Sequence, residues 1–149
     1  MKRSMLFSSI PWVSGLVSTV RTVGDSQAAQ VTVTVTGMAV ADGQIGCSLF
    51  KSADGFPMDG IAARQIWLLA SRDAVTCTFT EVPDGRYAVS VAHDLNGNKR
   101  VDTNFLGMPT EAWGVSGNAR PTLRTPTWDE AVFSVDGEAR VALQIRVAK

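Results

Sequence analysis

The strongest constraint on the fold is a strict alternation of apolar and polar residues with a period of two. Residues 31–36 read Val-Thr-Val-Thr-Val-Thr, and residues 141–147 alternate apolar side chains with polar or small ones. Successive side chains of a β-strand point to opposite faces, so this pattern predicts strands that are buried on one side. Further strands are expected at residues 44–50, 74–82, 86–92, 131–135 and 138–147.

Short strands separated by turn signals, with few helical periods, predict an all-β chain. We expect an antiparallel Greek-key β-sandwich of the immunoglobulin-like or transthyretin-like kind. Residues 131–135 and 138–147 are predicted to form a hairpin across Asp136-Gly137, while residues 62–70 fit either a short helix or a strand. A turn at residues 83–85 followed by Tyr87 is typical of a tyrosine corner, in which the hydroxyl bonds to nearby backbone.

The amino-terminal segment has the order of a signal peptide. Lys2 and Arg3 precede an uncharged, largely apolar run at residues 4–20, and Ser26 and Ala28 have the small-x-small spacing of a cleavage site. We therefore expect a signal peptide at residues 1–28 and export to the periplasm or the extracellular space. The alternative is an ordinary disordered or partly buried segment. A span of hydrocarbon needs about 20 apolar residues, so no stable membrane span is expected in the mature form.

Residues 29–149 are expected to form a single β-sandwich domain, and its two cysteines fit an exported protein. Cys47 and Cys77 each share their strand phase with apolar neighbours, so both thiols should face the core. An even count in an exported chain predicts one disulfide between them, and two free buried cysteines are the alternative. The spacing lacks the Cys-x-x-Cys pattern of zinc or thioredoxin-like sites.

A long loop at about residues 94–127 is where function is expected, because long loops without regular structure are often functional. The chain has 14 basic and 14 acidic residues, which gives no electrostatic footprint for nucleic acid. Near the start of this long loop, oxygen-bearing side chains recur at alternate positions, as in the first part of a calcium-binding loop. The predicted ligands are Asp94, Asn96, Asn98, Asp102 and the backbone carbonyl of Arg100.

Calcium binding by this loop is expected to be weak. Lys99 occupies the sixth position, where glycine normally permits a sharp turn, and Phe105 stands where the usual bidentate glutamate would be. The alternative is a loop whose Asp and Asn side chains bond to their own backbone.

The single histidine is a candidate for catalytic chemistry. Strand phase places His93 on the inward face, and a hydrolytic triad would need Ser116 with Asp94 or Asp102. The strand–elbow–helix context of such a nucleophile is missing, so a buried, hydrogen-bonded imidazole is favoured. Trp113 and Trp128 are expected to cover the open end of the sandwich, and an aromatic ligand platform is the alternative.

Together these residues carry a family resemblance that extends from about residue 31 to the carboxyl terminus. The matching positions are His93, Asp94, Asn96, Asn98, Asp102, Thr103, Asn104, Gly107, Pro109, Glu111, Gly114, Ser116, Asn118 and Ala119, with Gly43, residues 47–50, Phe56, Pro57, Cys77, Phe79, Pro83, Gly85 and residues 87–89 upstream. The chain resembles the bacterial domain-of-unknown-function family numbered 2141. It departs from the family pattern at Lys99, Ala112 and Gly117.

The resemblance implies a small exported β-sandwich of unassigned activity. It also places Glu111 beside the Asp/Asn loop, where this side chain either completes the metal site or bonds to His93. His93, Glu111, Ser116 and Asn118 are thus expected to support the loop.

Two classes of function remain, and a third is weighed beside them. The leading hypothesis is a non-enzymatic exported binding or accessory module that takes an unidentified protein or glycan ligand on this loop. The first alternative is a hydrolase-type enzyme that uses His93, Asp94 and Glu111. The second is a structural component of the cell envelope.

Overall fold

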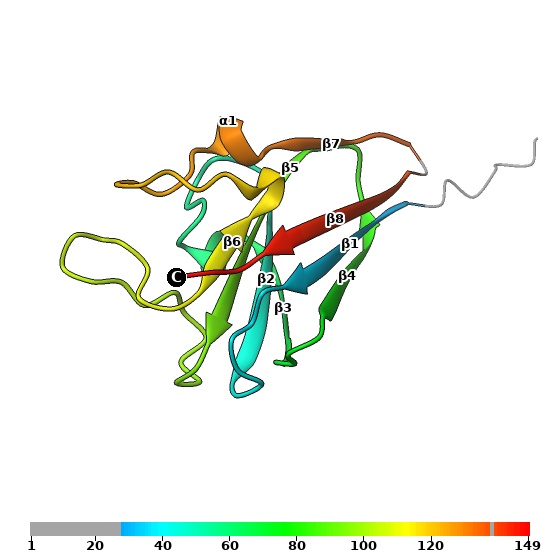
Figure 1. Ribbon diagram of the computed structural model, residues 1–149. Helices are drawn as coiled ribbons and strands as arrows, with labels where there is room; N and C mark the ends of the chain where they lie inside the picture. Colours follow the sequence, from blue (N-terminus) through cyan, green and yellow to red (C-terminus); the bar gives the residue numbers. More distant parts are fainter. Residues whose placement is uncertain (1–27, 138) are drawn as a thin grey trace, which may run out of the picture.

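The computed structural model describes residues 28–137 and 139–149, and most of its regular structure is β (Figure 1). The strands are β1 (Ala29–Thr36), β2 (Gln44–Phe50), β3 (Arg64–Leu69), β4 (Val75–Val82), β5 (Gly85–Asp94), β6 (Trp113–Val115), β7 (Phe133–Val135) and β8 (Arg140–Arg146). The short helical segments are η1 (Gly60–Ala62), η2 (Ser116–Asn118) and α1 (Trp128–Ala131). The strand at Arg64–Leu69 resolves the ambiguity left by the sequence at residues 62–70. The all-β prediction is confirmed.

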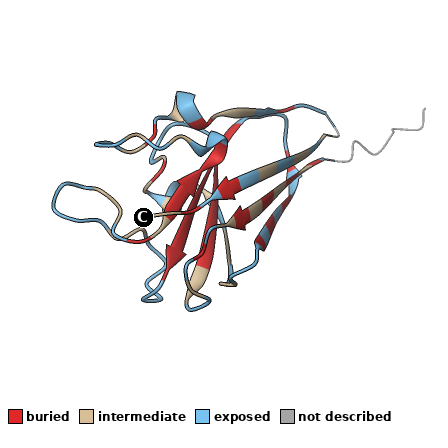
Figure 2. Cartoon of the chain, in the orientation of Figure 1, coloured by how far each residue is buried: buried red, intermediate tan, exposed pale blue. Residues whose placement is uncertain are grey.

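The strands form two sheets. One has the order β4-β1-β8, and the other has the order β3-β2-β5-β6, with β7 paired to the first residues of β5. The core draws alternate side chains from both sheets, and Val31, Val33 and Val35 of β1 are fully buried. Figure 2 shows the result as alternating buried and exposed residues along β4, and as buried residues alternating with half-buried ones along β1.

The predicted hairpin across Asp136-Gly137 is wrong. β7 pairs antiparallel with β5 in the larger sheet, whereas β8 crosses to the smaller sheet and pairs with β1 in parallel. The chain turns where Gly137, with a φ of 64°, donates its N–H to Asp84 Oδ1 at 2.8 Å. Alternation identifies the buried face of a strand but does not identify its neighbour, and a crossover buries that face as well as a hairpin does. Because β8 pairs with β1 in parallel, the expectation of antiparallel sheets throughout is also wrong.

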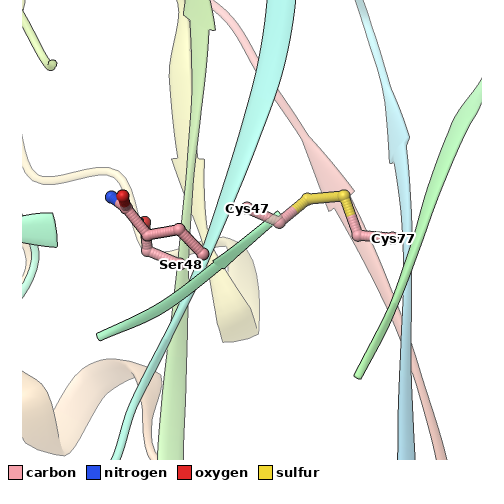
Figure 3. Close-up of a disulfide and its surroundings, with 4 residues drawn as sticks. Cys47, Ser48 and Cys77 are labelled. Atoms are coloured by element: carbon pink, nitrogen blue, oxygen red, sulfur yellow. A yellow bond between two sulfur atoms is a disulfide. The ribbon is translucent and has the colours of Figure 1, made fainter. Parts of the chain in front are cut away.

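The predicted disulfide is confirmed, and it joins the two sheets. Cys47 of β2 is bonded to Cys77 of β4, with the two Cα atoms 6.5 Å apart. Figure 3 shows the bridge on one side of β2 and Ser48 on the other. Adjacent residues of a strand face opposite ways. Cys47 therefore points into the core, and the next residue, Ser48, lies on the outer surface of the larger sheet.

The predicted tyrosine corner is also confirmed. The hydroxyl of Tyr87 donates a hydrogen bond of 2.8 Å to the carbonyl of Pro83, four residues earlier. This bond fastens the turn that leads into β5, the strand at the centre of the larger sheet.

The predicted signal peptide falls almost wholly on residues 1–27, which lie outside the described residues. Among residues 28–137 and 139–149, none of the helices has both the length and the apolar character that crossing a membrane requires.

Loss of the disulfide should lower stability markedly. The bridge spans 30 positions of the sequence, for which the chain-entropy account gives about 3–4 kcal/mol. We expect the free energy of unfolding of Cys47→Ala/Cys77→Ala, measured by denaturant titration, to be lower than that of the oxidised protein by this amount. A reducing agent should destabilise the original chain and leave the double variant unchanged, and equal sensitivity of both would contradict the assignment.

Candidate functional site

Asp94 organises the loop that follows β5. It is fully buried, and its carboxylate accepts three backbone N–H groups: Asn96 at 3.2 Å and Gly97 at 2.8 Å on Oδ1, and Lys99 at 2.7 Å on Oδ2. A short aspartate side chain favours such local bonds because it can imitate a backbone turn. The loop therefore folds over this carboxylate, and the position of Lys99 is fixed by it.

The other predicted calcium ligands are brought into the same loop, where they bond to one another. The amide groups of Asn96 and Asn98 donate to the two oxygens of Asp102 at 2.5 and 2.7 Å. Their amide oxygens accept the N–H groups of Asn98 and Arg100 at 3.1 and 3.0 Å. In the described part of the chain, no group of three or more His, Cys, Asp or Glu residues is arranged to hold a metal ion. Calcium binding stays a prediction.

His93 and Glu111 lie below this loop and are buried. The ring of His93 is 3% exposed, and its Nε2 lies 2.7 Å from the carbonyl oxygen of Asp42. Glu111 Oε1 accepts the N–H of Leu95 at 2.9 Å, and completion of a metal site by this residue stays a prediction. Its Oε2 is buried and has no hydrogen-bond partner among the described residues. Glu111 thus holds the loop at the residue after Asp94.

The side chains of Ser116 and Asn118 form hydrogen bonds with the backbone of other segments. The buried Ser116 hydroxyl accepts the N–H of Val89 at 3.0 Å and donates to the carbonyl of Ala131 at 2.6 Å. Asn118 donates to the backbone of β8 at Gln144 and accepts from Arg146, both at 3.0 Å. Val89 and His93 are four residues apart on β5, which is about 13 Å along a strand. The residues of the hydrolytic triad are therefore not brought together.

The helix α1 to which Ser116 is bonded has a charged cap. Glu130 accepts two side-chain hydrogen bonds of 2.8 Å from Arg124 and one of the same length from the backbone of Thr127. These bonds, first those from Arg124, lower the pKa of the Glu130 carboxyl to about 2. The pair is exposed and lies outside the cleft described below.

Trp113 and Trp128 belong to one apolar cluster on the larger sheet, packed with Ala88, Val115 and Ala131. The guanidinium of Arg120 lies 4.5 Å from the centre of the Trp113 ring.

A cleft of about 460 Å³ opens on the outer face of the larger sheet, and sequence reasoning missed it. Its floor is made of small residues in register: Gly46 of β2 lies opposite Ala92 of β5, and Ser48 lies opposite Ser90. Trp67 of β3 lies opposite Gly46 and covers it. A Cβ atom at Gly46 would fall 2.5 Å from the Trp67 ring, so only glycine permits this packing.

Two segments form the walls of the cleft. Pro57, Met58, Asp59, Gly60 and Ile61 come from the β2–β3 connection, and Lys99, Arg100, Val101, Asp102 and Thr103 come from the Asp/Asn loop. Gln65 also lines the cleft and donates a hydrogen bond of 3.3 Å to Ser48 Oγ. The loop predicted to be functional therefore contributes a wall, and the Asp94 carboxylate holds that wall in place.

One signal of this cleft was present in the sequence. The outward positions of two strands carry Gly46 with Ser48 and Ser90 with Ala92, where larger polar residues are usual. Their meaning depends on the register of β2 against β5, which the sequence did not supply.

Melting of the protein tests the calcium prediction. After EDTA treatment, millimolar Ca²⁺ should raise the Tm, because a ligand that binds only the folded state stabilises it. Asp102→Asn should abolish the shift, while Asp129→Asn, outside the loop, should retain it. Identical curves with EDTA and with Ca²⁺ would refute calcium binding.

Comparison with known proteins gives one finding. The family model described as "Uncharacterized protein conserved in bacteria" (DUF2141) matches residues 33–142, which is more than half of the chain. Neither the curated proteins nor the solved structures give a match. The matched range includes the disulfide, the Asp/Asn loop and both walls of the cleft. The chain therefore belongs to the bacterial family DUF2141.

Proposed function

We propose that the protein is an exported, non-enzymatic binding module that takes a glycan in the cleft on its larger sheet. The observation that carries this proposal is the floor of small residues beside Trp67. Binding sites are concave and combine apolar or aromatic surface with a few placed polar groups. This cleft has both.

A saccharide matches the chemistry of the lining. A sugar ring presents C–H groups that pack on an aromatic side chain such as Trp67, and hydroxyl groups that need hydrogen-bond partners. Ser48, Ser90 and Gln65 offer such partners at the floor, and Asp59 offers a further acceptor at one wall. The small floor residues leave room for a ring to approach the strands.

Burial of the candidate catalytic groups supports binding rather than hydrolysis. His93 and Asp94 are 3% and 0% exposed, and neither lines the cleft. Glu111 is buried as well and holds a loop amide. The three residues that the hydrolase alternative requires are therefore not accessible to a ligand in the cleft. The envelope-component alternative would be supported by an exposed apolar patch around Trp113, and this side chain is buried.

Export is supported by the disulfide. Such bonds persist in oxidising compartments and are rare in the cytosol of most organisms. The two sheets with their shared core support a single Greek-key β-sandwich domain at residues 29–149. A rigid domain that presents loops at one surface is a common way to build a binding protein.

An array of immobilised glycans tests the binding function with purified protein. We expect selective retention on a subset of saccharides, with affinity reduced about tenfold by Trp67→Ala because an aromatic contact is lost. Ser48→Val, which fills the floor, should also weaken binding.

Phe105→Ala provides the matched control. This side chain is 95% exposed, is not among the residues that line the cleft, and should be dispensable. Circular dichroism of each variant separates loss of binding from loss of folding. No retention on any glycan, or equal retention by Trp67→Ala, would reject the proposal.

Mass spectrometry of the protein recovered after expression with its own amino terminus tests export. The expected species lacks residues 1–28 and has a mass two hydrogen atoms below that of the reduced chain, because the disulfide has formed. An intact, reduced chain retained in the cytoplasm would contradict export.

A further inference from the structure

We propose that the ligand is an acidic saccharide, whose anionic group is held by Lys99 and Arg100 at one wall of the cleft. This inference rests on the proposed function, because it assigns the charge of the ligand that the same cleft takes. Both residues line the cleft, and both come from the loop that Asp94 folds.

The charges of the lining differ in how far they are already satisfied. Asp102 accepts an amide hydrogen bond on each of its oxygens, and Asp59 accepts the N–H of Ile61 at 3.1 Å. In contrast, the side chains of Lys99 and Arg100 donate no hydrogen bond within residues 28–137 and 139–149. The single ion pair found in that part of the chain joins Arg124 to Glu130. The cleft therefore holds two cations whose donors remain free for a ligand.

The backbone at Lys99 gives an independent reason. Its φ is 55°, in the left-handed region that favours glycine, and the nearby Gly97 has a φ of 75°. A residue with a Cβ is strained there, more so than glycine, and strained positions cluster at functional sites. The loop nevertheless carries a long cationic side chain at this position. Binding of an anion would give the lysine at this position a use that glycine, which would fold more readily there, does not have.

The arrangement also sets the class of ligand. The neutral serine and glutamine groups lie at the floor beside Trp67, and the two cations lie at the wall. A sugar ring over the floor would place a carboxylate or sulfate substituent against that wall. Hydrogen bonds between charged groups are stronger than neutral ones, so this contact would discriminate acidic from neutral saccharides.

The experiment compares paired probes by titration calorimetry on the purified full chain. Oligogalacturonate is paired with its methyl ester, and a sulfated oligosaccharide is paired with its desulfated form. We expect the charged member of a pair to bind more tightly and to weaken as the salt concentration rises. The pair that shows this difference tells whether a carboxylate or a sulfate is recognised.

Variants separate the cations from the fold. Lys99→Gly and Arg100→Ala should each reduce affinity for the acidic probe about tenfold. Lys99→Gly relieves the backbone strain, so its Tm should be equal to or above that of the original chain. Lys99→Arg should retain binding, and Lys51→Ala, an exposed cation away from the cleft, should have no effect.

The outcomes distinguish this inference from the proposed function. Equal binding of charged and neutral saccharides, unaffected by Lys99→Gly, would overturn the inference while the glycan-binding function stands. Absence of binding to every saccharide would overturn both. Binding of poly-L-glutamate in place of saccharides would also overturn both, because the partner would then be an acidic polypeptide.

Discussion

The antiparallel register of β2 against β5 determines both faces of the larger sheet. On the inner face it sets Cys47 opposite Val91, in the core shared with the smaller sheet. On the outer face the same register aligns the small residues that form the floor of the cleft. A slip of one residue would exchange the two sets, turning the cysteine to the outer face and the serines to the core. The core, the disulfide and the proposed binding surface thus depend on one pairing of strands.

The sequence predicted those features that depend on local chemistry. Alternation located the strands, the phase of Cys47 and Cys77 indicated their bond, and the turn before Tyr87 indicated the corner. The sequence did not predict the features that depend on which strands become neighbours. The parallel pairing of β8 with β1 and the cleft on the outer face both require long-range register, which a period of two does not encode.

The Asp/Asn loop illustrates the same limit at the level of side chains. Its pattern of oxygen-bearing residues is compatible with a cation and equally with a network of internal hydrogen bonds. In the structure the carboxylate of Asp94 gathers three backbone amides, and Asp102 gathers two side-chain amides. The observed bonds match the alternative given by the sequence, in which Asp and Asn side chains bond to nearby backbone groups. What the loop provides is a wall of fixed shape.

The disulfide is attached at Cys47, between the two floor residues Gly46 and Ser48. The floor is therefore tethered through one side chain to β4 in the opposite sheet, and it cannot shift without moving both sheets. Mechanically, the proposed binding surface has a stiff base and walls made of two loops. Replacement of wall residues such as Lys99 would then alter the preferred ligand of the proposed site without disturbing its base.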